Sequence, residues 1–505
     1  MKTLYKIPVA VLIAFVLFVP YSCTDGYDEL NTNPKLVTDD IIKPGLLFTK
    51  VLKQSSFEIL DQARIGEYSG YSSRGDSGQP LNFGVFGPFS NYTSHIVNLA
   101  AIIRLTDGDP TMANMNAMAR IWKVWVFHRM TDAFGDIPYF DSAKSFEEVV
   151  PSPTYDTQEA IYKDLLNELK EAAVQLSTDV DQIGFGAADV LYGGDADSWK
   201  RFANSLRLRL AIRVRYADQT LAQTHISDVL SAPLITSNDQ SAKVTSEGEG
   251  AADLANTNPL YQNFVNGSAG AGNATVVGLA LVENLKNNND PRLSIFTDPN
   301  EVSDEYVGRP INMDADEKAA YPGVSHLDEA FIQAEYDFNA LLASEVSFLR
   351  AEAALAGLSS ENANNLFRAG IQLSMEQYGV DAGDITTFLT SAAGTLSGST
   401  EEQLEQIIVQ KYLALFGDSY EAWTEHRRTG YPRQWIGSLS ALDSDFAMPR
   451  RSAYPLAEYN LNGVNVKAAV ARLVGGDLLT SRIWWDAKAG LPFDHPKQGV
   501  FPPYD

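Results

Sequence analysis

Cysteine, long apolar runs and basic side chains are all scarce in this chain of 505 residues. The single cysteine, Cys23, has no partner within the chain, so no intramolecular disulfide can brace the fold. The chain is 45% hydrophobic and 10% aromatic, which is typical of a globular protein with a large core. Its 39 basic side chains face 64 acidic ones, giving a formal net charge of −25. That balance argues against nucleic-acid binding, which requires a basic surface.

The chain also lacks the short motifs that mark common catalytic sites. It contains no G-x-x-x-x-G-K-[ST], no G-x-S-x-G and no H-E-x-x-H. Its six histidines are scattered, and none is paired at the spacing of a helical metal site. The acidic pairs Asp195/Asp197 and Asp314/Asp316 lack the Gly and Glu of an EF-hand loop, so we expect them to cap loops. We therefore predict no catalytic residue, no metal and no cofactor, with a glycosidase carboxylate pair as the remaining enzymatic alternative.

The most apolar run lies near the start, at 7–19, and follows two lysines. This order is typical of a secretory signal peptide, and the run is shorter than the roughly 20 apolar residues of a membrane-spanning helix. A signal that ends in a cysteine after a small residue resembles a bacterial lipoprotein signal. The resemblance implies a signal peptide at 1–22, an acylated Cys23 and a polar tether at 23–38. The alternatives are cleavage elsewhere, which leaves a free thiol, and a single spanning anchor.

Helical periodicity dominates the rest of the chain. Two segments begin with a capping-box pattern, Asp156 with Glu159 and Ser399 with Glu402. Neighbouring helices with short turns favour stacked helical hairpins similar to tetratricopeptide repeats. We expect helices at 40–62, 90–105, 111–133, 156–176, 197–216, 219–230, 276–287, 344–356, 360–378 and 401–416.

The helix expected at 197–216 is rich in arginine. In a basic protein such a helix would suggest nucleic-acid binding, but here apolar residues alternate with the arginines and the chain is acidic. We therefore expect ion pairs with acidic helices around it. The arginines are Arg201, Arg207, Arg209, Arg213 and Arg215.

Long stretches without helical periodicity separate the helices. Loops of this length in a compact domain are usually functional or disordered. The first three contain aromatics among Asn, Asp and Arg, which is unlike a flexible linker, and the fourth is rich in Gly, Ser and Thr. They lie at 64–90, 241–275, 290–343 and 380–400.

Several short phrases follow one another along the chain, each occurring once. They are DAFGDIPY at 132–139, YGGD at 192–195, WKRFANSLR at 199–207, NDPRL at 289–293, EAWTEHRRTGYP at 421–432, MPRR at 448–451, EYN at 458–460 and RIWWD at 482–486. In this order, and after a lipoprotein-like start, they resemble the SusD/RagB family of outer-membrane nutrient-binding lipoproteins. The resemblance covers about 23–486.

The resemblance implies a mostly helical single domain at 39–505. Four tetratricopeptide-like helix pairs would form the scaffold, and irregular segments with a few short strands would form the ligand side. It implies a lipoprotein on the outside of the outer membrane that binds oligosaccharide without catalysis. The ligand would pass to a TonB-dependent transporter of the SusC type. Peptide capture, known for some relatives, is the alternative.

The resemblance also implies a place for the sugar. In relatives an aromatic residue and an asparagine at the start of a helix contact the ligand, and Phe89, Asn91 and Tyr92 occupy the corresponding place. Sugar binding needs flat aromatic faces and planar polar groups, which Tyr71, Arg74 and Asp76 add nearby. The alternative is that this cluster anchors the loop to the scaffold. Second-rank candidates are Tyr261, Phe264, Asn273, Tyr306, Arg309 and Tyr321.

Overall fold

The computed structural model describes most of the chain after residue 41. The described residues are 42–58, 65–73, 88–142, 150–265, 276–311, 313–437 and 448–492. The chain divides into two units, Met1–Lys43 and Pro44–Asp505, and the elements below belong to the second. The signal peptide and tether predicted at 1–38, with Cys23, lie outside the described residues.

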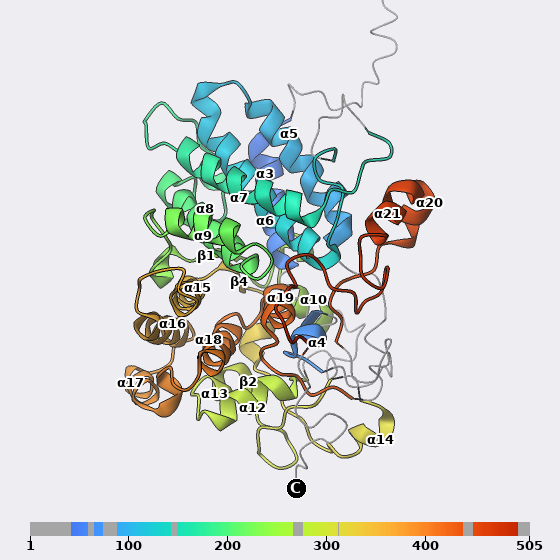
Figure 1. The fold of residues 1–505 in the computed structure, drawn as a ribbon. Coiled ribbons are helices and arrows are strands. Elements are labelled where there is room, and N and C mark those ends of the chain that lie inside the picture. Colours follow the sequence, from blue (N-terminus) through green and yellow to red (C-terminus); the bar gives the residue numbers. More distant parts are fainter. Residues whose placement is uncertain are drawn as a thin grey trace, which may run out of the picture. The chain divides into compact units, whose positions relative to one another are not determined.

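The first half of this unit is a series of helices that pack on their sequence neighbours (Figure 1). α5 packs on α6, α6 on α7, α7 on α8 and α8 on α9, while α3 packs across α5. These helices are α3 (Pro44–Phe57), α5 (Val97–Thr106), α6 (Ala113–Phe134), α7 (Gln158–Gln175), α8 (Ala196–Arg213) and α9 (Gln219–Val229).

The second series of helices packs in the same manner. α15 contacts α16 and α18, α18 contacts α19, and α15 also contacts α8, which joins the two series. These helices are α15 (Ala343–Leu355), α16 (Ala363–Gln377), α17 (Ala382–Thr390), α18 (Thr400–Ala414) and α19 (Ser419–Thr429). Among the described residues, short connections join α5 to α6, α8 to α9, α15 to α16, α16 to α17 and α18 to α19. The predicted fold class, mostly α with a helical-hairpin scaffold, is confirmed.

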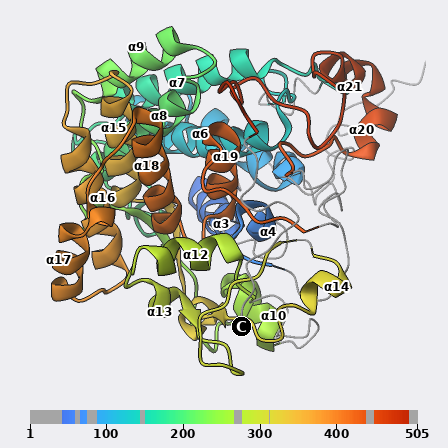
Figure 2. The ribbon, with the colours of Figure 1, turned by 60° about the horizontal axis from the view of Figure 1, so that its bottom comes forward.

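Shorter elements fill the segments between the helix pairs. Strand β1 pairs with β4 and β2 with β3, both antiparallel. The short helices α20 and α21 lie at one edge of this unit, across from α16 and α17, in both Figure 1 and Figure 2. The elements are α4 (Ile65–Ser69), α10 (Pro259–Val265), α12 (Leu279–Asn287), α13 (Leu293–Phe296), α14 (Ala315–Lys318), α20 (Leu456–Leu461), α21 (Gly463–Val470), β1 (Ala242–Thr245), β2 (Thr297–Asp298), β3 (His326–Leu327) and β4 (Asp337–Leu341).

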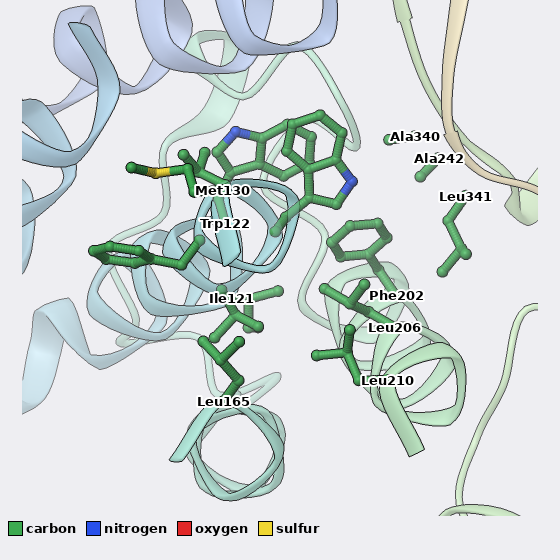
Figure 3. Packing of buried hydrophobic residues seen from close by; sticks show 14 of the residues in the cluster. Ile121, Trp122, Met130, Leu165, Phe202, Leu206, Leu210, Ala242, Ala340 and Leu341 are labelled. Atoms are coloured by element: carbon green, nitrogen blue, oxygen red, sulfur yellow. The ribbon is translucent and has the colours of Figure 1, made fainter. Parts of the chain in front are cut away.

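The main core lies where α6, α7 and α8 meet. Trp122 of α6, Leu165 of α7 and Phe202 of α8 converge there (Figure 3). The Trp122 ring stacks on Trp125 with 4.5 Å between centroids, and its Nε1 donates to Ser55 Oγ at 3.0 Å. Large aromatic surfaces removed from water are a major source of stability. These tryptophans therefore belong to the scaffold.

The arginine-rich helix α8 forms ion pairs, as predicted, and most of these pairs are buried. Arg209 Nη2 lies 2.6 Å from Glu345 Oε2, while Arg213 pairs with Asp132 and Glu421. Arginine is suited to such sites because its planar guanidinium can satisfy several acceptors at once. The pairs join α8 to α6, α15 and α19, so charge as well as apolar packing connects the two helix series.

Several local predictions were wrong; α19, for example, begins at Ser419 in a segment for which no helix was predicted. Residues 380–400 contain the helix α17, which the abundance of Gly, Ser and Thr concealed, because only Ile385 and Phe388 of this helix are buried. Asp156 is not the cap of α7: Thr157 is, and its side chain accepts from Ala160 N. The capping box of Ser399 and Glu402 at the start of α18 is confirmed.

The end of α6 places a turn that matters for the site described next. α6 ends at Phe134, and Gly135 follows with φ 87°, a conformation that glycine adopts without strain. The turned chain continues through Ile137, whose carbonyl accepts from Asp156 N at 3.0 Å. The next residue, Pro138, lies beside the turn that leads into α5, because its carbonyl accepts a hydrogen bond from Tyr92.

Candidate ligand pocket

Two aromatic residues at the start of the α5 segment form one wall of a pocket. Phe89 lies in the 3₁₀ turn Pro88–Ser90, and Tyr92 begins a π-helical turn, Tyr92–Ile96, that leads into α5. The two rings meet edge to face at 5.2 Å, and Phe89 also meets Phe134 at 5.2 Å. Tyr92 Oη donates to the Pro138 carbonyl at 2.5 Å. Both rings are thereby fixed in orientation.

The pocket has a volume of about 730 Å³. Small-molecule sites usually have volumes of about 300–1,000 Å³, so this space falls within the range of a ligand pocket. A second wall, formed by residues 150–153 and by Glu458 and Leu461 of α20, also lines the pocket. The lining is largely apolar, with Arg104 and Asp141 among the few charged groups.

Hydrogen bonds connect the two parts of this second wall, residues 150–153 and α20. The side-chain amide of Asn462 donates to the Pro153 carbonyl at 2.7 Å, and that of Asn465 donates to the same carbonyl at 3.1 Å. Tyr155 Oη donates to Glu458 Oε2 at 2.7 Å. Segment 150–155 and α20 therefore form one connected wall.

The electrostatic environment keeps the tyrosines of this region protonated. Burial, followed by the negative charge of Glu458, raises the pKa of Tyr92 well above its usual range. Burial and the hydrogen bond to Glu458 likewise raise the pKa of Tyr155. Both phenols remain hydrogen-bond donors at neutral pH, and Glu458 is the common source of negative charge.

Asn91 faces away from the pocket although it lies between the two aromatics. Its Nδ2 donates to Glu58 Oε2 at 3.3 Å, and the His95 Nε2 lies 2.9 Å from the other oxygen of Glu58. Asn91 and His95 are four positions apart and both are buried. The π-helical turn thus directs Tyr92 to one side and this polar cluster to the other, which fits the frequent occurrence of π-turns at functional sites.

The other predicted residues do not line the pocket. Tyr71 is fully buried, and its hydroxyl donates to the Tyr412 carbonyl at 2.5 Å. Arg309 is buried and its Nη2 donates to the Ser73 carbonyl at 2.8 Å. Tyr321 is buried in a small separate cluster, and Tyr306 is half-buried against the main core.

Four of the predicted site residues cannot be placed from the structure. Arg74, Asp76 and Asn273, together with the side chain of Phe264, lie outside the described residues. Tyr261, in the same helix as Phe264, is half-buried on α10 and is not part of the pocket lining.

The sequence did not lead us to predict the residues of the second wall, 150–153 and α20, as part of the pocket. Pro138 and Glu458 line the pocket but lie in the phrases DAFGDIPY and EYN, which indicated the family and were not proposed as ligand contacts. Two prolines in close succession, Pro151 and Pro153, were the available signal, because proline holds a segment extended and leaves its carbonyls for other donors. Only the fold brings 150–153 to α20.

Stacked helical hairpins with a ligand pocket at the side define a class of binding protein rather than a specific chemistry. The family model described as SusD-like, starch-binding and associating with the outer membrane matches residues 42–455. The chain therefore belongs to the SusD-like family, as the sequence resemblance indicated. Comparison with functionally curated proteins gives no match.

Solved structures share the fold over most of the chain. A Bacteroidetes SusD-like protein, AC2a, has a TM-score of 0.77 at 23% identity, covering 88% of this chain and 100% of its own. A chitin-binding SusD homologue from Flavobacterium johnsoniae has a TM-score of 0.73 at 26% identity, with coverage of 88% and 98%. A SusD homologue from Bacteroides vulgatus has a TM-score of 0.74 at 27% identity, with coverage of 88% and 97%.

No helix in the described ranges is long and apolar enough to cross a bilayer. Within the same ranges, no group of three or more His, Cys, Asp or Glu side chains is arranged to hold a metal ion.

Proposed function

We propose that this protein is a cell-surface lipoprotein that binds oligo- or polysaccharide and delivers it to a partner TonB-dependent transporter of the SusC type. The pocket bounded by Phe89 and Tyr92 is the observation that supports it most directly. Aromatic faces bind the apolar C–H side of a sugar ring, and a space of about 730 Å³ fits several rings. Membership of a family associated with the outer membrane supports the location.

We further propose that the protein binds its glycan without cleaving it. Glycoside hydrolysis requires two carboxyl groups on opposite sides of the scissile bond. In the pocket, Glu458 is engaged by Tyr155, and Thr154 Oγ1 donates to Asp141 at 3.1 Å. These bonds suit carboxylates that hold the wall and contact ligand hydroxyls.

Calorimetric titration of the detergent-purified full chain with a glycan panel tests the proposal. The panel includes chitin oligosaccharides, because a relative at 26% identity is chitin-binding. We expect binding of at least one glycan and no cleavage products by chromatography. Binding of peptides alone would favour the peptide-capture alternative, and product formation would contradict the non-catalytic role.

Substitutions test the location of the site. Tyr92→Ala removes one aromatic wall, and a loss of about three- to tenfold in affinity is expected from the usual value of an aromatic contact. Tyr92→Phe keeps the ring and removes only the hydrogen bond to Pro138. Tyr261→Ala is the matched control outside the pocket. Unchanged affinity in Tyr92→Ala, with a loss in Tyr261→Ala, would move the site to α10.

A further inference from the structure

Several hydroxyl groups of the pocket already donate their protons to backbone carbonyls of the protein. Tyr92 Oη and Ser142 Oγ both donate to the Pro138 carbonyl, and Thr93 Oγ1 donates to the Ser90 carbonyl at 3.0 Å. The Asn462 amide donates to Pro153. These protons are committed to the protein, so the same hydroxyls are left to act toward a ligand as acceptors.

Glu458 adds an acceptor with capacity to spare. Its Oε2 accepts from Tyr155, while Oε1 has no hydrogen-bond partner among the described residues. An ionised carboxylate offers about four acceptor positions. Glu458 is half-buried at the first turn of α20, beside the exposed Leu461, so a ligand in the pocket can reach it.

The charge of the lining is also unbalanced. Asp141 and Glu458 oppose a single guanidinium, that of Arg104, in a chain with a net charge of −25. Such a lining repels anionic groups of a ligand. A partly desolvated carboxylate also forms a stronger hydrogen bond with a cationic donor than with a neutral donor. Uronate and sulfate groups are therefore disfavoured, and a protonated amine is favoured.

We propose that the pocket selects glycans that contain free amino sugars, with Glu458 accepting from the sugar ammonium while the ring lies along Phe89 and Tyr92. The proposal rests on the proposed function, because it names the class of glycan that the same pocket prefers. It assigns Glu458 a role in specificity, which its position in a family phrase did not suggest.

The test compares oligosaccharides of equal length and linkage on the full chain by calorimetry. At about pH 5.5 ordinary carboxylates are ionised, and the amine of glucosamine is protonated. We expect β-1,4-linked glucosamine tetramer to bind about three- to tenfold more tightly than the N-acetylglucosamine tetramer. The ratio should fall as salt is raised from about 50 mM to about 0.5 M, and a galacturonic acid tetramer should bind more weakly than either.

Glu458→Gln isolates the contribution of this residue. The amide oxygen can still accept from Tyr155, so the wall is retained while the charge is lost. We expect the affinity ratio of the two tetramers to fall close to one. Glu376→Gln, an exposed position of α16, makes the same charge change across the molecule from α20 and should leave the ratio as in wild type.

The possible outcomes separate this inference from the proposed function. Equal or tighter binding of the N-acetylated tetramer by wild type would overturn the inference and leave glycan binding intact. An amine preference that persists in Glu458→Gln would overturn the role of Glu458. If no glycan of the panel binds at all, the proposed function itself fails.

Discussion

Several arginine and glutamate side chains are fully buried in the core of this protein. Arg428 is fully buried and makes a bidentate contact with Glu352, at 2.6 and 2.7 Å, while its Nη2 lies 2.6 Å from Glu425. Removal of one partner from a buried ion pair leaves an uncompensated charge and costs about 3–5 kcal/mol. We expect Arg428→Met to lower the free energy of unfolding by this amount, measured by denaturant titration.

An exposed ion pair provides the control. Lys163 and Glu159 form a salt bridge on the surface of α7, four positions apart. Solvent and salt screen such exposed pairs, so Lys163→Met should change the free energy of unfolding far less than Arg428→Met. Comparable losses in Lys163→Met and Arg428→Met would contradict the difference in burial on which the prediction depends.

The same network predicts a dependence of stability on pH. Burial alone would raise the pKa of Glu352, but the guanidinium groups of Arg428 and Arg215 outweigh burial and hold this pKa at about 2. The unfolded chain has the ordinary value near 4.5, so it takes up the proton first as the pH falls. The contribution of Glu352 to stability is therefore complete above about pH 4.5 and is lost as the pH falls toward 2.

Glu352→Gln separates this residue from the other carboxylates. Glutamine imitates the protonated side chain, so wild type should be more stable than Glu352→Gln at pH 6. We expect the difference in unfolding free energy to stay nearly constant from pH 6 to about pH 4.5 and to shrink from there as the pH falls toward about 2. A difference that does not vary with pH would show that the charge of Glu352 contributes nothing.

At the scale of elements, the start of α18 is held by a reciprocal pair of hydrogen bonds. Glu402 N donates to Ser399 Oγ at 3.3 Å, and Ser399 N donates to Glu402 Oε2 at 2.7 Å. Ser399→Ala removes the first bond and should cost about 1 kcal/mol in unfolding free energy. Ser399→Asp keeps an acceptor at the cap and should retain most of the stability, so an equal loss in both variants would exclude capping as the cause.

The elements also show how far the sequence could predict this molecule. Helices with an apolar stripe and a defined cap, such as 401–416, were predicted within a few residues, because both signals are local. α17 was missed because only two of its side chains are buried. Phe89 and Tyr92, which form the aromatic wall of the pocket, were among the residues predicted to contact the ligand. The second wall depends on contacts between 150–153 and 456–462, which no local sequence pattern encodes.

The whole molecule separates a rigid scaffold from a pocket built at its side. The two helix series are joined by buried ion pairs, while the pocket uses turns, a π-helical segment and the short helix α20. α20 has no buried residue; its Glu458 accepts a hydrogen bond from Tyr155, and Asn462 at its C-terminal end donates to the Pro153 carbonyl. Changes in 150–153 and α20 should therefore affect the core less than changes to Phe89 and Tyr92, which pack against it.

The proposed lipid anchor at Cys23 can be tested separately from the pocket. In the proposed function Cys23 carries the lipid, and two or more acyl chains suffice for stable anchoring where one does not. Cys23→Ser should move the protein from the membrane fraction to the soluble fraction of fractionated cells, with loss of the lipid mass from the N-terminal peptide. The purified variant should bind its glycan with unchanged affinity, because the pocket is built entirely within the unit that begins at Pro44.

Thr24→Ser, which keeps the cysteine, is the matched control and should remain with the membrane. An unmodified Cys23 in the wild-type protein, or a Cys23→Ser variant that stays in the membrane fraction, would contradict the anchor while leaving the fold and the pocket untouched. The two proposals can therefore fail independently, because the proposed anchor is a covalent modification near the start of the chain and the pocket is a product of tertiary contacts.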